Sequence, residues 1–248
     1  MGTLRFSLRV LAMLAGLLLL LPLHYGWRLT GADSPWPRRW LWWVGRAAGF
    51  KTIVRGTPLG KRVLFVANHL SWLDIMILAG ATGAAFVSKD EVARWPVLGW
   101  LARLNRTIFV NRSERRAVHG QADAVRTALA SGQPVALFPE GTTDGGTEVL
   151  PFRASLLSAL FPPLPGIRVQ PVALDYGAAA AGIAWVGQEA AADNARRVLS
   201  RRGTTQVTLH FLAPLDPSEA HHRKALAESS RSAIVAALGP SALPADRL

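Results

Sequence analysis

A short apolar run followed at once by polar side chains is the feature that most limits the fold of this chain. Residues 62–67 read RVLFVA, and His69 and Asp74 follow within seven positions. A nearly continuous apolar run of this length is typical of an interior strand in a sheet covered on both faces. Ligands of open α/β sheets bind at the carboxyl ends of strands. The pattern therefore predicts an α/β fold with a functional site directly after this strand.

Beyond residue 50, strand-like and helix-like segments alternate along the chain. Strands are expected at 52–55, 63–67, 84–87, 107–110, 135–138, 169–174 and 206–211. Helices are expected at 72–79, 114–130, 153–160 and 218–238. Such alternation predicts a single α/β domain with a mixed, largely parallel sheet flanked by helices.

The N-terminal segment has the composition of a membrane anchor. Residues 10–23 are apolar and are followed by Tyr25, Trp27 and Arg28. A full crossing needs about 20 apolar residues, so this run also fits a segment that lies in one leaflet. No convincing signal-peptide cleavage site follows it, and we expect the segment to be retained.

Residues 36–46 combine four tryptophans with three arginines. This mixture suits the headgroup layer of a membrane, although a tryptophan-rich helix packed on the domain is the alternative. The chain is therefore expected to comprise a membrane-anchoring helical segment (1–50), an α/β domain (51–238) and a frayed tail (239–248).

Charge and cysteine content limit the function classes. The formal net charge is +12, which indicates an anionic partner, either nucleic acid or a membrane surface. Because the sequence contains no nucleic-acid-binding module and does contain an apolar N-terminus, we expect membrane lipids and no nucleic acid. The absence of cysteine excludes disulfides, thiolate metal sites and a cysteine acyl-enzyme. No His/Asp/Glu cluster has ligand spacing, so neither a metal nor another cofactor is expected.

Two interpretations of the polar stretch 68–74 follow from the residues alone. Asp74 would orient His69, leaving one ring nitrogen free as a base for a hydroxyl proton. Alternatively, Ser71 and Asp74 form a capping box, and Asp74 serves only the start of a helix.

Four segments resemble, in the right order, the sequence blocks of the 1-acyl-sn-glycerol-3-phosphate acyltransferases and related glycerolipid acyltransferases. They are Asn68–Asp74, Thr107–Arg112, Phe138–Thr142 and Val169–Leu174. The resemblance covers roughly residues 52–215 and implies an α/β acyltransferase domain. It implies transfer of a fatty acyl chain from acyl-CoA or acyl carrier protein to the sn-2 hydroxyl of 1-acyl-sn-glycerol-3-phosphate. The product would be phosphatidate, made at the cytoplasmic face of the inner membrane.

The resemblance also implies site roles. His69 and Asp74 would be catalytic. Residues expected to bind substrate are Asn68, Lys89, Arg112, Glu140, Gly141, Thr142 and Arg153. Of these, Arg112 and the block 140–142 would contact the phosphate of the acceptor, Glu140 by orienting an arginine or holding the loop. Lys89 would meet a phosphate of the acyl donor.

The chain departs from the family at two positions. Thr143 stands where the third block commonly continues with arginine, and Arg106 stands where the second block usually has glycine. Arg153 would replace the missing charge. A Thr-x-Asp-Gly continuation also occurs in similar acyltransferases that act on lyso-ornithine lipid, so this acceptor is an alternative. A hydrolase would need a Gly-x-Ser-x-Gly elbow, which is absent, and the non-enzymatic alternative is a basic module that binds lipid surfaces.

Overall fold

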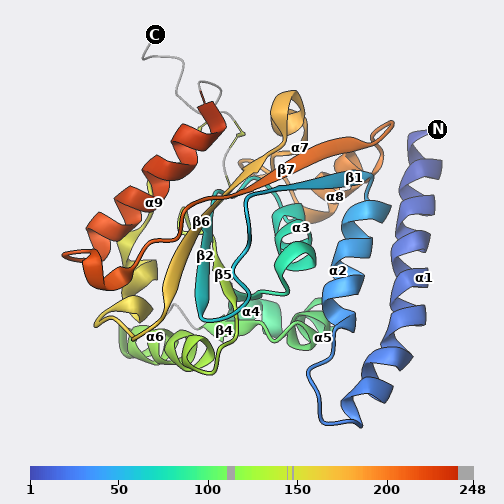
Figure 1. Cartoon of the computed structure of the whole chain (residues 1–248). Coiled ribbons are helices and arrows are strands. Elements are labelled where there is room, and N and C mark those ends of the chain that lie inside the picture. The colour runs from blue at the N-terminus through green and yellow to red at the C-terminus, as the bar shows by residue number, and fades with distance from the viewer. Residues whose placement is uncertain (111–114, 144, 147, 240–248) are drawn as a thin grey trace.

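The computed structural model describes residues 1–110, 115–143, 145–146 and 148–239, and only the backbone of residues 89 and 115–121. Within these residues, seven strands form one sheet in the order β1-β7-β6-β2-β5-β3-β4, with helices on both faces (Figure 1). The strands are β1 (Phe50–Arg55), β2 (Val63–Ala67), β3 (Ala85–Lys89), β4 (Ile108–Val110), β5 (Val135–Leu137), β6 (Arg168–Asp175) and β7 (Thr205–Phe211). All neighbouring strands are parallel except β6 and β7. The predicted α/β fold with a mixed, largely parallel sheet is confirmed.

The helices agree less closely with the prediction. The α-helices are α1 (Gly2–Arg28), α2 (Trp36–Ala47), α3 (Leu73–Thr82), α4 (Asp90–Ala93), α5 (Pro96–Leu104), α6 (Arg115–Ala130), α7 (Ala180–Ile183), α8 (Ala191–Leu199) and α9 (Arg223–Leu238). Short 3-10 helices are η1 (Ala154–Leu160), η2 (Gly177–Ala179) and η3 (Pro217–Glu219). The helix expected at 153–160 is therefore a 3-10 helix, and the helix expected from residue 218 begins at Arg223. The helices α5 and α8 were not predicted.

The central strand β2 separates two hydrophobic cores because successive side chains of a strand point to opposite faces. Val63, Phe65 and Ala67 pack in one core, which includes side chains of α2 and α3. Leu64 and Val66 pack in the other core, which includes side chains of α6, η1 and α9. All five side chains are almost fully buried, as expected for a strand covered on both faces.

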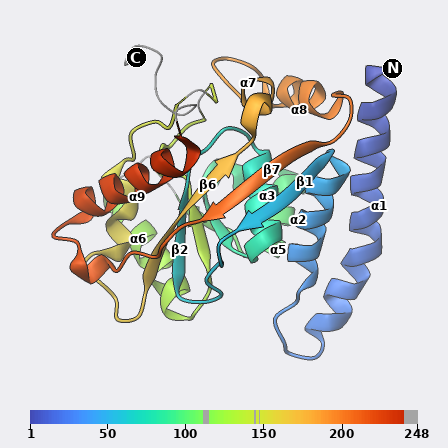
Figure 2. The same cartoon turned by 45° about the horizontal axis from the view of Figure 1, so that its top comes forward.

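The N-terminal helices lie side by side at one end of the sheet (Figures 1 and 2). Helix α1 extends well beyond residues 10–23 and, by length and composition, could cross a membrane. It packs closely on α2, because Gly16 leaves room for the ring of Trp43, whose indole N–H donates to the carbonyl of Ala12 at 2.8 Å. A Cβ on Gly16 would lie 2.2 Å from that ring.

Helix α2 takes part in the core as well as in the surface. Leu41 and Val44 are buried, whereas Trp42 and Trp43 are partly exposed. The helix therefore combines both expectations for residues 36–46, a face packed on the domain and an exposed aromatic face. The division of the chain at residue 50 stays a prediction. Apart from Gly239, the expected tail (239–248) lies outside the described residues.

Candidate active site

The loop after β2 brings His69 and Asp74 together at the carboxyl end of the sheet's central strand. The Nδ1 atom of His69 lies 2.8 Å from Oδ2 of Asp74, which is fully buried on the first turn of α3. With the proton on Nδ1, the ring donates to Asp74 and its Nε2 atom keeps a lone pair. The His69 side chain retains 17% exposure, so it is accessible from outside the loop.

Asp74 also organises the loop itself. Its Oδ2 atom accepts backbone N–H groups of Leu70 at 2.6 Å and Ser71 at 2.8 Å. One carboxylate oxygen thus contacts both the backbone of the turn before α3 and the ring of His69. Because this oxygen also contacts His69, Asp74 does not serve only the start of α3, and the N-cap residue of that helix makes no capping hydrogen bond with its side chain.

Tyr176 is a further partner of Asp74, and sequence analysis does not select it. Its hydroxyl donates to Oδ1 of Asp74 at 2.6 Å. Burial, and then the neighbouring carboxylate, raise the pKa of Tyr176 well above its ordinary value. The residue therefore remains a hydrogen-bond donor over the whole working range of pH. Its only sequence signal is its place directly beyond the strand of the fourth block.

Phe138 fixes the plane of the histidine ring. The two rings stack with centroids 4.0 Å apart and planes 6° from parallel. Phe138 follows β5, the neighbour of β2 in the sheet, so the third block directly contacts the first. The imidazole is thus held at one edge by Asp74 and on one face by Phe138.

Glu140 and Asn68 tie the catalytic loop to its surroundings. Glu140 is buried and accepts the backbone N–H of His69 at 2.9 Å and that of Leu150 at 3.2 Å. The side-chain amide of Asn68 both donates to and accepts from the backbone of Leu174 on β6. These contacts give both residues a structural role. The substrate-binding role expected for each of them stays a prediction.

Arg153 lies against Gly141 of the third block. Gly141 has a φ of +77°, and a Cβ there would lie 3.1 Å from Nε of Arg153. The backbone N–H of Arg153 donates to the carbonyl of Pro139 at 2.8 Å, which fixes the arginine beside the block. A guanidinium thus stands next to residues 140–142, as the sequence suggested, and Thr142 beside it is exposed.

Two expected binding residues are only partly placed or not placed. Arg112 lies outside the described residues. Lys89 ends β3 and pairs in register with Val110, the last residue of β4, but its side chain is not described. The backbone thus puts Lys89 beside the start of the segment that carries Arg112. Both binding roles stay predictions.

The two departures from the family have structural counterparts. The hydroxyl of Thr143 donates to the carbonyl of Trp185, and the N–H of Trp185 donates to the carbonyl of Leu70 at 2.8 Å. Thr143 is thereby linked to the catalytic loop. Arg106 adopts a φ of +57°, a left-handed conformation that favours glycine, and its guanidinium contacts Asp33 at 3.2 Å.

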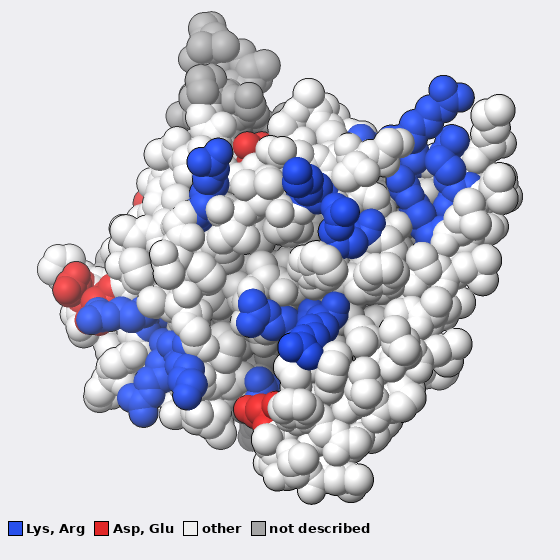
Figure 3. Space-filling view, turned by 45° about the vertical axis from the view of Figure 1, so that its right-hand side comes forward, with Lys and Arg blue, Asp and Glu red and all other residues white. Residues whose placement is uncertain are grey.

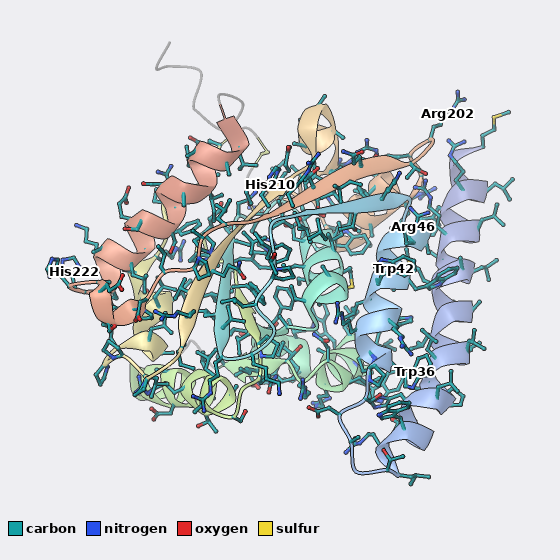
Figure 4. All side chains as sticks on the ribbon, in the orientation of Figure 1. Trp36, Trp42, Arg46, Arg202, His210 and His222 are labelled. Carbon is teal, nitrogen blue, oxygen red and sulfur yellow. The ribbon has the colours of Figure 1, made fainter. Side chains whose placement is uncertain are left out.

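Among the other described histidines, His210 lies 4.0 Å from a carboxylate oxygen of Asp175, which is too far for a hydrogen bond. His210 lies on β7 and His222 precedes α9, well apart from each other (Figure 4). The ring of His222 accepts the N–H of Ala225 at 3.0 Å and caps α9. In the described ranges, no group of three or more His, Asp or Glu side chains could hold a metal ion.

Two cavities adjoin the site. The first has a volume of about 240 Å³. Its mainly apolar lining comes from strands β2 to β5, helix α6 and η1, and Arg153 is part of this lining. The second, of about 470 Å³, adjoins the loop after β2 and includes Asn68, Glu148 and Asp175 in its lining.

Comparison with known proteins identifies the family of the chain. The family model described as "Acyltransferase" matches residues 51–175. A lyso-ornithine lipid O-acyltransferase of Rhodobacter capsulatus is 36% identical over 95% of this chain and 90% of its own. A 1-acyl-sn-glycerol-3-phosphate acyltransferase of Neisseria gonorrhoeae is 40% identical over 46% of this chain and 44% of its own. The crystal structure of PlsC, the 1-acyl-sn-glycerophosphate acyltransferase of Thermotoga maritima, superimposes with a TM-score of 0.66 at 20% identity, covering 96% of each chain. Because the family model matches half of the chain and the Rhodobacter capsulatus enzyme matches nearly all of it, the chain belongs to the acyltransferase family.

Proposed function

We propose that this acyltransferase moves a fatty acyl chain from a thioester, acyl-CoA or acyl carrier protein, to a hydroxyl of a lyso-lipid at the membrane. The observation that carries the proposal is the His69–Asp74 pair, held at 2.8 Å by a loop at the end of the central strand. A lipid hydroxyl is a weak nucleophile until its proton is removed, and a positioned imidazole supplies that base.

The proposed reaction needs no covalent enzyme intermediate. Nε2 of His69 takes the hydroxyl proton while the lipid oxygen attacks the thioester carbonyl. Asp74 stabilises the imidazolium that results, as in hydrolase triads. When the tetrahedral intermediate collapses, the C–S bond breaks, and the leaving thiolate receives the proton from His69. The products are the acylated lipid and the free thiol.

For the acceptor, we propose lyso-ornithine lipid first and 1-acyl-sn-glycerol-3-phosphate second. The lyso-ornithine lipid acyltransferases of Rhodobacter capsulatus and Brucella abortus match this chain over 95% and 96% of its length. The cavity beside the catalytic loop carries the carboxylates of Glu148 and Asp175, which complement the amine of an ornithine headgroup. The block containing Arg112 favours the phosphate acceptor instead.

The apolar cavity suits the acyl chain. Its walls include Leu64, Val87, Val125 and Leu137, and Arg153 stands at its edge. A hydrocarbon chain placed there leaves water for a dry apolar surface, which is favourable in proportion to the area buried. We propose that this cavity holds the chain being transferred.

We propose that α1 and α2 hold the enzyme on the membrane, at the cytoplasmic face. The outer side of α1 exposes a row of leucines, among them Leu4, Leu8, Leu11 and Leu18. Deletion of residues 1–50 is expected to release the protein from vesicles. Because α2 takes part in the core, the deletion should also lower the melting temperature. If the truncated, folded protein still floated with vesicles like the full chain, the anchor would lie elsewhere.

The proposal is tested by measuring thiol release with acyl-CoA and acyl carrier protein donors against both lyso-lipid acceptors. His69→Ala should lower the rate by about 10²–10⁴-fold, the usual contribution of general base catalysis. His221→Ala, a matched loss of an imidazole at an exposed position before α9, should retain activity. A His69→Ala enzyme as active as His221→Ala would show that His69 is not the general base.

Acceptor identity is tested separately. If Arg112 binds a phosphate monoester, Arg112→Ala should raise the KM for 1-acyl-sn-glycerol-3-phosphate by about 10- to 150-fold, because a charge-assisted hydrogen bond contributes about 1.5–3 kcal/mol. Turnover of lyso-ornithine lipid should change little. A wild-type enzyme that prefers the phosphate acceptor would reverse our order of acceptors and leave the His69–Asp74 mechanism intact.

A further inference from the structure

Four arginines meet where the first turns of α1 lie against the turn between α8 and β7, and we call this group the arginine junction. Its members are Arg5, Arg9, Arg201 and Arg202. Nε of Arg5 donates to the carbonyl of Ser200 at 2.9 Å, and the guanidinium of Arg9 donates to the carbonyls of Leu199 and Gly203 at 3.2 and 2.9 Å. Figure 3 shows basic side chains beside one end of α1, and Figure 4 shows Arg202 beside the same end.

The charge of the arginine junction is not balanced by acidic side chains. Among the ion pairs within the described residues, none includes a member of the junction. The carbonyls at the end of α8 contribute only about half an elementary charge of opposite sign, against four guanidinium charges. The neighbouring Arg46 and Lys51 are also basic.

One guanidinium in the junction has a donor without an acceptor. Nη1 of Arg201 is buried and has no hydrogen-bond partner within the described residues, while its Nη2 lies 3.4 Å from the hydroxyl of Thr205. A buried donor without an acceptor is unfavourable, and in native structures such groups commonly bind water, an ion or a ligand. For a guanidinium among other guanidinium groups, a phosphate oxygen is the best-matched acceptor.

The surface next to the junction indicates what carries this phosphate. Leu4, Leu8 and Leu11 on the same turns of α1 are 64%, 56% and 61% exposed. A soluble anion would use only the arginines, whereas a phospholipid would use the arginines for its headgroup and the leucines for its acyl chains. We propose that the arginine junction binds the phosphate group of an anionic membrane phospholipid that is not a substrate.

The sheet topology gives this site a consequence for catalysis. Because β7 runs antiparallel to β6, the first residues of β7 lie near the carboxyl ends of β6 and β2. The α8–β7 turn is therefore on the side of the sheet where His69 stands. A phospholipid bound at the junction would hold that side of the domain at the bilayer surface, where a lyso-lipid acceptor resides.

The test uses the full-length protein and vesicle flotation. One set of vesicles is phosphatidylcholine alone, and the other is an equal mixture of phosphatidylcholine and phosphatidylglycerol. Arg201→Gln/Arg202→Gln should lose about 25-fold in partitioning onto the mixed vesicles, since each basic residue near an anionic surface contributes about fivefold. Partitioning onto phosphatidylcholine should be unchanged. Arg223→Gln/Lys224→Gln removes the same charge from exposed positions on α9 and is the control.

Two further measurements keep the test decisive. Because Arg201 is partly buried, the single variant Arg202→Glu, at an exposed position, is measured beside the double variant, and both are checked for an unchanged melting temperature. Inorganic phosphate is added to the detergent-solubilised protein, to learn whether the junction takes a free anion. A preference for phosphatidylglycerol that both junction variants lose supports the proposal. Equal losses in the α9 control, an unchanged preference, or stabilisation by inorganic phosphate without any vesicle preference would overturn it.

Discussion

Removal of the Tyr176 hydroxyl should slow catalysis through its hydrogen bond to Asp74. Tyr176→Phe takes away the donor at 2.6 Å from Oδ1 of Asp74, and both side chains are buried. A hydrogen bond to a charged group contributes about 1.5–3 kcal/mol. The free energy of unfolding should fall by that amount, and the melting temperature by roughly 3–12 °C for a chain of this size.

The effect on the rate follows from the same bond. Asp74 stabilises the imidazolium that His69 becomes in the transition state, so the full 1.5–3 kcal/mol sets an upper limit of about 10- to 150-fold on the loss of kcat. The KM for the acyl donor should not change, because Tyr176 is not part of the lining of the cavity proposed for the acyl chain. Since burial and Asp74 hold the pKa of Tyr176 well above its ordinary value, the loss should be the same throughout the working pH range.

The assay is steady-state thiol release by Tyr176→Phe, with Tyr25→Phe as the control. Tyr25 is 47% exposed, so the control makes the same chemical change at the surface. A variant of Tyr176 that melts earlier but keeps the wild-type kcat would refute the reasoning. Tyr176 would then only fill the core, and Asp74 would orient His69 without it.

Two further predictions concern the third sequence block and the loss of stability at low pH. Gly141→Ala should lower stability by about 1–2 kcal/mol through its left-handed backbone and should raise the KM for the acceptor, because the added Cβ presses on Arg153. Gly132→Ala is the control, with a φ of +90° and no atom within 4 Å, so it should show the strain without the change in KM. Hydrogen bonds, first from Arg197, lower the pKa of Glu189 to about 2 from 4.5, so its contribution to stability is present above pH 4.5 and is lost as the pH falls towards 2. Denaturant unfolding across this range should show a flatter pH dependence for Glu189→Gln.

The sheet was predictable because its strands carry their own signal. Each expected strand overlaps an observed one. The interior strand β2 is buried on both faces and stands out from its polar flanks, whereas β7 alternates buried and less buried residues. The helices α5 and α8 span only nine residues each, and so short a segment gives little periodicity to detect. Over a segment of seven residues, the spacing of apolar positions does not distinguish an α-helix from a 3-10 helix. For this reason the 3-10 character of η1 was not predicted.

The contact between His69 and Asp74 was predictable because the two residues are five positions apart and belong to one loop. The residues that hold the pair were not. Glu140 and Tyr176 lie 71 and 102 positions away from their partners, and only the strand order brings them together. Sequence blocks identify such segments as important, but the contacts between blocks depend on which strands are neighbours.

Thr143 links the third sequence block, which is expected to bind the acceptor, to the loop that carries His69. Its hydroxyl bonds to the carbonyl of Trp185, whose N–H bonds to Leu70, the residue that follows His69. Thr143→Arg would restore the residue that is common in the family, and charge alone would predict faster turnover of the phosphate acceptor. We expect the opposite, a lower kcat on both acceptors, because arginine cannot replace this bond without moving the loop.

Thr143→Val removes the hydroxyl at nearly constant volume and should lower kcat in the same direction. The loss should be modest, because a neutral hydrogen bond contributes about 0.5–1.5 kcal/mol. If Thr143→Arg instead gained activity on 1-acyl-sn-glycerol-3-phosphate and Thr143→Val matched the wild type, the link to Leu70 would have no role. The charge beside residues 140–142 would then select the acceptor independently of the base.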